Sequence, residues 1–360
     1  MMVFKTVLVV VASLLACAAL TNAWPCPDPA AIAPCICTET DIHIDMDCSA
    51  VQSDTQLYEA FRNDPFETYR RLTIVKNTTE ARVPITRLTV DTFANVTFSY
   101  IRISHTTLND ITSDAFLNSY ARLETVIVTD GYLTTFPFDM LADCPKLTDL
   151  RVFRNKITHM ADIHSDSLTY LQASYNPNMK FGDAAFEDAP ALEYLILNDI
   201  GLDHVAEDTF INQKALKYLD LGHNLIHTLY SGAFTFYETL DQLKLESNRI
   251  GSVQDNAISG LKAGTFLWIH RNRLDDTPES AWRPVFDSVN ADPDLNLFVF
   301  DENFLTCQCN ILWLVENDDY MNTLAKGAWC YDNGEYVEDV NVAFLQQNCL
   351  RDSYVPSLLW

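Results

Sequence analysis

Residues 216–250 have the sequence LKYLDLGHNLIHTLYSGAFTFYETLDQLKLESNRI, in which one apolar pattern occurs twice at an interval of 24 residues. The two copies place equivalent residues at Leu216, Leu219, Leu221, Asn224 and Ile226, and at Leu240, Leu243, Leu245, Asn248 and Ile250. We number each copy from its first leucine, Leu216 or Leu240, as position 1. Apolar and polar residues alternate at positions 4 to 6, which predicts a short strand with one apolar face. A single copy cannot bury that face, so further copies must lie beside it.

The same unit extends over most of the chain. Its first positions are Tyr69, Phe98, Leu123, Leu147, Leu168, Leu192, Leu216, Leu240, Gly264 and Leu295, and the interval of 24 residues occurs five times. The pattern L-x-x-L-x-L-x-x-N-x-L is the signature of leucine-rich repeats. We therefore expect an α/β solenoid with a curved parallel sheet on its concave side and irregular or short helical segments on its convex side.

Residues at the same position of successive units form a column, and two further columns have a regular composition. Position 9 is asparagine in seven units, where its amide can satisfy buried turn groups: Asn77, Asn155, Asn176, Asn224, Asn248, Asn272 and Asn303. Position 19 is apolar and is expected to line the convex side of the core: Phe116, Leu141, Phe186, Phe210, Phe234 and Ile258. The unit 264–294 is longer than its neighbours, and its extra residues, including an exposed or half-buried Trp282, form either a binding loop or a poorly ordered rim.

The ends of the chain differ from its middle. Lys5, the apolar run from Val7 to Leu20 and the small residue Ala23 predict a signal peptide. No later stretch is long enough for a spanning helix, and the last residues do not resemble a GPI signal, so no membrane insertion is expected. The expected divisions are a signal peptide (1–23), an N-terminal cysteine-rich cap (24–68), repeats (69–302), a C-terminal cysteine-rich cap (303–350) and a tail (351–360).

Cysteines mark the two caps. Four lie at each end, Cys26, Cys35, Cys37 and Cys48 and then Cys307, Cys309, Cys330 and Cys349, which favours disulfides over a zinc site in an exported protein. Spacing alone leaves three pairings open in each cluster. In the first cap, Ile44 and Met46 predict an edge strand before Cys48, and 54–63 predicts a short helix. Cys144 is expected to be a buried free thiol, with an intermolecular disulfide as the alternative.

The two cysteine blocks resemble the flanking modules of extracellular leucine-rich repeat proteins, although the usual Asn-Pro-Trp/Phe lead-in appears here as Asn303-Phe304-Leu305. This resemblance implies the pairs Cys26–Cys37, Cys35–Cys48, Cys307–Cys330 and Cys309–Cys349. The segments 24–29, 32–35 and 46–49 also resemble arthropod proteins of the oplophorus-luciferin 2-monooxygenase non-catalytic subunit family. Members are solenoids without assigned catalytic residues, which implies a role in holding a partner.

On a solenoid strand, positions 2, 3, 5, 7 and 8 are expected to point off the concave surface. The candidate partner-binding residues there are Tyr100, Arg102, Arg151, Arg154, Tyr170, Tyr175, Tyr194, Tyr218, Phe266 and Trp268. Tyrosine and tryptophan are common in binding hot spots, but the same ladder could serve only to stabilise the sheet. The cations Arg71, Lys76, Arg102, Arg151 and Arg154 suggest an anionic spot on the partner, or else local pairing with Asp130 and Asp149.

Composition and motifs exclude several functions. The net charge of −25 disfavours nucleic-acid binding. No metalloprotease, serine-hydrolase or phosphate-binding motif occurs, and we expect no metal, cofactor or catalytic residue. Asp199, His223 and Ser247 share position 8 of successive units, but an open sheet surface gives such a row no oxyanion hole. Of the two sequons, Asn95 is expected to be accessible to glycosylation, whereas Asn77 is expected to be buried if its unit is regular.

These observations predict a secreted, extracellular, non-catalytic protein that holds a protein partner on its concave face as the accessory subunit of an extracellular complex. The alternative is a soluble innate-immune protein that recognises a microbial or glycan ligand.

Overall fold

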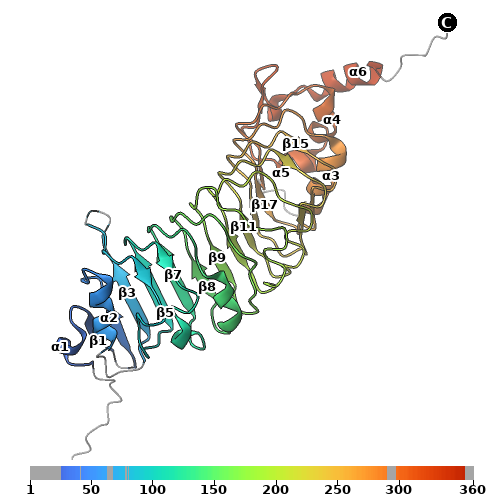
Figure 1. Cartoon of the computed structure of the whole chain (residues 1–360). Coiled ribbons are helices and arrows are strands. Elements are labelled where there is room, and N and C mark those ends of the chain that lie inside the picture. Colours follow the sequence, from blue (N-terminus) through green and yellow to red (C-terminus); the bar gives the residue numbers. More distant parts are fainter. Residues whose placement is uncertain are drawn as a thin grey trace, which may run out of the picture.

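A computed structural model describes residues 26–40, 42–62, 68–77, 79, 81–289 and 297–352. The predicted signal peptide, and the predicted tail beyond residue 352, lie outside this part. The chain forms a long curved solenoid in which the strands lie side by side from the N-terminal to the C-terminal end (Figure 1). No helix within the described residues is long and apolar enough to cross a bilayer.

The concave side is one sheet. Within the described residues it has 12 strands in the order β1-β2-β3-β5-β7-β8-β9-β10-β11-β14-β17-β18. Their bounds are β1 Ile36–Glu39, β2 Ile44–Asp47, β3 Arg71–Val75, β5 Tyr100–Ser104, β7 Thr125–Thr129, β8 Asp149–Arg151, β9 Tyr170–Gln172, β10 Tyr194–Ile196, β11 Tyr218–Asp220, β14 Gln242–Lys244, β17 Phe266–Trp268 and β18 Phe298–Val299. Leu195, Leu219 and Leu243 pair in register on parallel strands, which confirms the predicted solenoid.

The first strand of the sheet differs from the prediction. Residues 44–47 do form a strand, but β2 is covered by β1, which pairs with it in the antiparallel direction. Ile36 of β1 is largely exposed, whereas Ile44 and Met46 of β2 are buried. The edge is therefore β1, and the expectation that 44–47 forms it was wrong because a hairpin turns the chain back over that side.

The convex side holds short elements around a column of rings. These elements are β4 Arg87–Leu88, β6 Asp110–Ile111, η1 Leu117–Ser119, η2 Phe138–Asp143, β12 Thr228–Leu229, β13 Phe234–Thr235, β15 Ser252–Val253 and β16 Ile258–Ser259. Phe186, Phe210 and Phe234 are buried and stack with centroids 5.9 and 6.0 Å apart. Burial of the whole position-19 column confirms its predicted role in the core.

The asparagine column closes each turn. Asn224 Nδ2 donates to the carbonyls of Leu197, Leu221 and Gly222, while Oδ1 accepts from the amides of Ile200 and Leu202. The residue before it, at position 8, has a left-handed backbone with φ between 53° and 56° in nine described units: His105, Asp130, Arg154, Tyr175, Asp199, His223, Ser247, Arg271 and Glu302. That conformation disfavours β-branched side chains, and none of the nine is β-branched.

The first unit departs from this pattern. Asn77 is exposed, although the other six position-9 asparagines are buried. Lys76, which precedes it, is not among the residues with positive φ. The left-handed turn that points the amide into the core is thus missing, so the first unit is not regular and the condition on which Asn77 was expected to be buried is not met.

Disulfide-bonded caps close both ends. The N-terminal cap contains α1 Pro29–Ile32 and α2 Asp54–Arg62, with Cys26 bonded to Cys37 and Cys35 to Cys48. The C-terminal cap contains η3 Cys309–Ile311, α4 Leu312–Val315, α5 Asp318–Thr323, β19 Trp329–Cys330, β20 Glu335–Tyr336, η4 Val337–Asp339 and α6 Val342–Asp352. Its bonds join Cys307 to Cys330 and Cys309 to Cys349. All four are the pairs that the resemblance implied.

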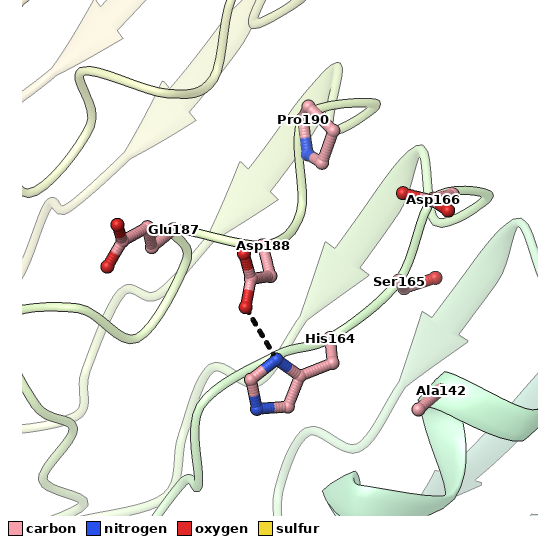
Figure 2. A pocket seen from close by; sticks show the side chains of 7 residues that line it. All are labelled: Ala142, His164, Ser165, Asp166, Glu187, Asp188 and Pro190. Atoms are coloured by element: carbon pink, nitrogen blue, oxygen red, sulfur yellow. Dashed lines mark hydrogen bonds and ion pairs between the residues drawn. The ribbon is translucent and has the colours of Figure 1, made fainter.

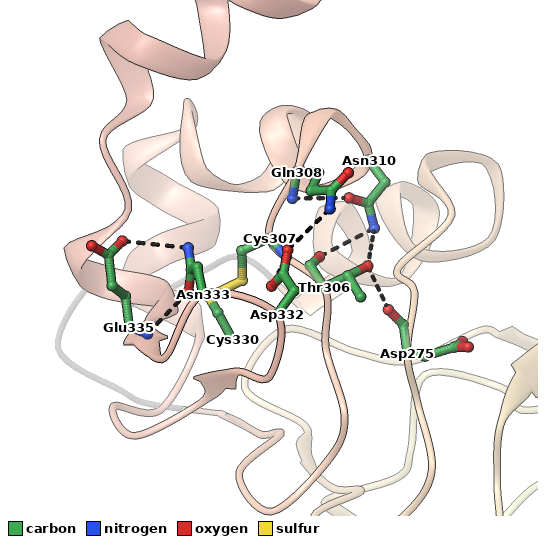
Figure 3. The surroundings of a disulfide bond; sticks show 9 residues. All are labelled: Asp275, Thr306, Cys307, Gln308, Asn310, Cys330, Asp332, Asn333 and Glu335. Carbon is green, nitrogen blue, oxygen red and sulfur yellow. Dashed lines mark hydrogen bonds between the residues drawn. A yellow bond between two sulfur atoms is a disulfide. The ribbon is translucent and has the colours of Figure 1, made fainter.

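Polar side chains join the C-terminal cap to the last repeats (Figure 3). Asp332 accepts hydrogen bonds from the Cys307 amide at 3.0 Å and from Gln308 Nε2 at 3.3 Å. Thr306 Oγ1 donates to the Asp275 carbonyl at 2.9 Å. The disulfide Cys307–Cys330 therefore lies in a network that connects the cap to the preceding unit.

Two remaining expectations concern buried residues. The long unit contains the helix α3 Glu279–Val289, and Trp282 is fully buried with its ring 4.8 Å from that of Phe300. The expected exposure of Trp282 was wrong, since the extra residues form an amphipathic helix that packs on the core. Cys144 is buried and free, as expected, and burial raises the pKa of its thiol to about 12.

Candidate binding face

A tyrosine ladder occupies the middle of the concave face. Tyr170, Tyr194 and Tyr218 pair in register on β9, β10 and β11, and their ring centroids are 5.8 and 6.2 Å apart. Tyr194 is 39% exposed. The three rings thus form a continuous surface in the predicted place, with aromatic contact area open to solvent.

The N-terminal half of the face is cationic. Arg71 lies over the ring of Tyr100 at 4.4 Å, and Arg151 lies over Tyr170 at 4.3 Å. Arg151 also donates two hydrogen bonds to Asp149, at 2.8 and 2.9 Å. The local pairing that was one of the two alternatives is therefore present for Arg151.

Further predicted residues lie at the turn or on the strand surface. Arg154 and Tyr175 both occupy position 8, the left-handed turn column. The Arg154 guanidinium lies 5.2 Å from the centroid of the Tyr175 ring, and its Nη1 atom lies 3.9 Å from Asp130 Oδ1. Arg102 is exposed on β5. Phe266 is half-buried and packs partly on the core. The structure thus spreads the ten predicted residues along the whole concave face.

The C-terminal half contains charged residues that the sequence analysis did not select. Lys244 Nζ lies 5.8 Å from the Tyr218 ring and 5.7 Å from the Trp268 ring. It is also 3.9 Å from Glu246 Oε1. The sequence could have indicated Lys244 and Glu246, because they occupy positions 5 and 7, which point off the concave face.

The Asp199, His223 and Ser247 row does not form a catalytic triad. All three residues adopt the left-handed turn conformation, and no hydrogen bond joins their side chains, all of which are described. Asp199 instead accepts from Asn198 at 3.3 Å. Parallel placement on successive turns explains why the side chains do not converge.

A histidine-carboxylate pair lines a shallow cavity of about 380 Å³ between return segments (Figure 2). His164 Nδ1 lies 2.8 Å from Asp188 Oδ2, and both side chains are more than half exposed. The nearby Ser165 Oγ accepts from the backbone amides of Ser167 and Leu168 and so caps the turn into β9. This arrangement is an exposed His164–Asp188 hydrogen-bonded pair beside a serine that caps a turn.

Within the residues that the structure describes, no three His, Cys, Asp or Glu side chains are grouped so as to hold a metal ion. Aromatic rings, cations and carboxylates together line the concave face.

Repeat register, an aromatic concave surface and two disulfide caps define a leucine-rich repeat protein. Family models agree: "Leucine rich repeat" matches residues 190–250, and "BspA type Leucine rich repeat region (6 copies)" matches 70–163. The chain is 32% identical over 338 residues to the Oplophorus-luciferin 2-monooxygenase non-catalytic subunit of Oplophorus gracilirostris, covering 91% of this chain and 89% of that one. The chain belongs to the family of that subunit.

Solved structures share the fold. A chain of the Drosophila Toll–Spatzle complex superposes with a TM-score of 0.63 at 19% identity, covering 84% of this chain and 45% of that chain. A chain of the octameric complex of Latrophilin 3, Unc5D and FLRT2 superposes with a TM-score of 0.56 at 18% identity, covering 76% and 89% of the two chains. Both structures are of protein complexes, and at this level of identity they show that the fold is shared.

Proposed function

We propose that this chain is a secreted, non-catalytic subunit that holds a protein partner on its concave face within an extracellular complex. The observation that carries the proposal is the ladder of Tyr170, Tyr194 and Tyr218, which presents three adjacent half-buried or exposed rings. Rigid aromatic rings give a large contact area at a low entropy cost on binding. The name of the curated relative, a non-catalytic subunit, supports the same role.

Secretion and glycosylation are parts of this proposal. Four disulfides within one chain suit an oxidising compartment. Asn95 is exposed in a return segment, and Asn77 is exposed as well, which supports glycosylation at either asparagine. A mature N-terminus near Trp24, and a loss of mass on treatment with a peptide N-glycosidase, are the expected results for the secreted chain.

Co-purification of the tagged chain from the animal's own extracellular fluid tests the main proposal. The expected result is one protein partner in stoichiometric amount. Replacement of Tyr170, Tyr194 and Tyr218 by alanine should remove that partner while circular dichroism shows an intact fold.

The matched control replaces the return-segment residues Tyr230 and Tyr237, which are 40% and 44% exposed, by alanine. That control should keep the partner. Retention of the partner by the ladder variant would contradict the proposal. Capture of glycans or whole microbes in place of a protein would favour the immune-recognition alternative.

A further inference from the structure

Two columns of polar residues meet on the C-terminal half of the concave face. Position 5 supplies Asp220, Lys244 and Trp268, which pair in register on β11, β14 and β17. Position 7 supplies Gly222, Glu246, His270 and Asp301 on the segments that follow these strands and β18. Adjacent strands lie about 4.8 Å apart, so side chains of both columns are close neighbours.

Gly222 brings two carboxylates together. A Cβ atom at that glycine would lie 3.1 Å from Glu246 Oε1 and 3.2 Å from Asp220 Oδ1. The Glu246 side chain therefore extends over the glycine toward Asp220, in space that a larger residue would fill. Burial raises the pKa of Asp220, and the nearby charge of Glu246 acts in the same direction.

Polar atoms of this cluster are buried without hydrogen-bond partners. They are Glu246 Oε2, Trp268 Nε1, His270 Nδ1 and Asp301 Oδ1. Buried polar groups in native proteins are nearly always paired, and each one left unpaired costs about 1 to 3 kcal/mol. Three of these atoms, Glu246 Oε2, His270 Nδ1 and Asp301 Oδ1, are able to accept hydrogen bonds from a donor of the partner, whereas Trp268 Nε1 is itself a donor.

Charge and shape indicate the chemistry of that ligand. Asp220, Glu246 and Asp301 carry three carboxylates, with Lys244 near Asp220 and Glu246 and with Arg271 near Asp301. Lys244 Nζ is 3.9 Å from Glu246 Oε1, which is beyond hydrogen-bond distance. The rings of Tyr218 and Trp268 flank the same amine, and aromatic faces attract ammonium and guanidinium groups.

We propose that this cluster, the acidic-aromatic cluster of Asp220, Glu246, Trp268, His270 and Asp301, binds lysine or arginine side chains of a basic segment of the protein partner. The carboxylates and the imidazole nitrogen accept its N–H groups, and Tyr218 and Trp268 contact its charged plane or amine. Side-chain rotation, which is common at interfaces, gives the ligand access to the buried atoms. The inference rests on the proposed function, since it names the partner's chemistry on the same face.

Fluorescence anisotropy of the full secreted chain with labelled octapeptides tests this inference. The probes are GSRGSRGS, GSKGSKGS and a neutral version of the first with citrulline in place of arginine. Wild type should bind at least one cationic probe about tenfold more tightly than the citrulline probe, since hydrogen bonds to charged groups are strong. The comparison of the arginine and lysine probes decides which side chain fits better.

The double variant Glu246→Gln, Asp301→Asn should lose this preference. The control Asp183→Asn, Glu187→Gln removes the same charge from exposed return-segment sites and should keep it. The single variants Glu246→Gln and Asp301→Asn serve if the double variant does not fold, and each should weaken the preference. Equal binding of cationic and citrulline probes by wild type, or equal losses in both double variants, would overturn the inference.

The probes need no natural partner, so the two proposals fail separately. If the tyrosine-ladder variant keeps its partner while wild type prefers the cationic probe, the proposed function fails. If the ladder variant loses its partner while wild type shows no such preference, only this inference fails.

Discussion

The two halves of the concave face use the same scaffold but differ in how their polar groups are satisfied. In the N-terminal half, Arg151 donates two hydrogen bonds to Asp149. In the C-terminal half, Glu246 Oε2 and Asp301 Oδ1 are buried without partners. Among the described residues of the N-terminal half, Arg71 Nε and Asn155 Oδ1 are also buried without partners, but they lie in units that do not adjoin.

This difference indicates where hydrogen bonds from a partner would add most to the free energy of binding. A paired guanidinium must give up its local carboxylate before it gains an external one, so the net gain is small. A buried carboxylate oxygen without a hydrogen bond, such as Glu246 Oε2, gains a charge-assisted hydrogen bond from an incoming cation. We therefore expect the tyrosine ladder to provide contact area for the partner and the acidic-aromatic cluster to select for positive charge.

The largest expected effect concerns the shared scaffold. Asn224→Ala should lower the free energy of unfolding by about 4 kcal/mol, because several buried backbone groups lose their partners. Asn155→Ala should cost only about 2 kcal/mol, since Asn155 Oδ1 has no partner and only Nδ2 is used. Urea denaturation of both variants measures the two values, and equal losses would contradict the hydrogen-bond account.

The left-handed turn column gives the next effect. His223→Val should cost about 1 to 2 kcal/mol, because a β-branched side chain opposes positive φ. His223→Gly should cost nothing or stabilise slightly, since glycine adopts this conformation freely. Thermal unfolding of the pair checks this, and a valine variant as stable as wild type would show that position 8 is unstrained.

Lys244 and Arg151 test the contrast between the halves directly. Lys244→Met should tighten binding of GSRGSRGS by about threefold to tenfold, because it removes a cation that competes for the carboxylates. Arg151→Met should change that affinity by less than about twofold, since its charge is already paired with Asp149. Anisotropy titrations of both variants measure the two affinities. Weaker binding of the probe by Lys244→Met would contradict the idea that Lys244 competes with the probe for the carboxylates.

A smaller effect depends on pH. Burial raises the pKa of Asp220 above its ordinary value of 3.8, so its ionised form is less favourable in the folded chain. Stability from this group is therefore present below that ordinary value and is lost as pH rises through the folded pKa. Asp220→Asn should be more stable than wild type at pH 7, and the gain should vanish below the ordinary value. A gain that persists at low pH would point to another cause.

The sequence predicted the scaffold because one period repeats along the chain. Spacing alone placed Leu219 and Leu243 in register and gave Phe210 and Phe234 a stacked core position. It missed the exposed Asn77 and the buried Trp282, which lie in units that break the period. Regular spacing carries no information about irregular segments.

The candidate site was predicted only in part. The tyrosine ladder follows from equal positions in successive units, as the pairing of Tyr194 with Tyr218 shows. The acidic-aromatic cluster depends on how the Glu246 side chain extends over Gly222 and on which atoms remain unpaired. Those features depend on rotamers and on contacts between strands, which column positions do not specify.

Site-specific photo-crosslinking tests the central claim most directly. A benzophenone amino acid placed at Tyr194, which is 39% exposed on the concave face, is compared with one at Tyr237, which is 44% exposed on a return segment. The account predicts that irradiation in the native fluid joins the partner to the chain labelled at position 194 and not to the chain labelled at 237. Crosslinking to the partner from position 237 alone would contradict it.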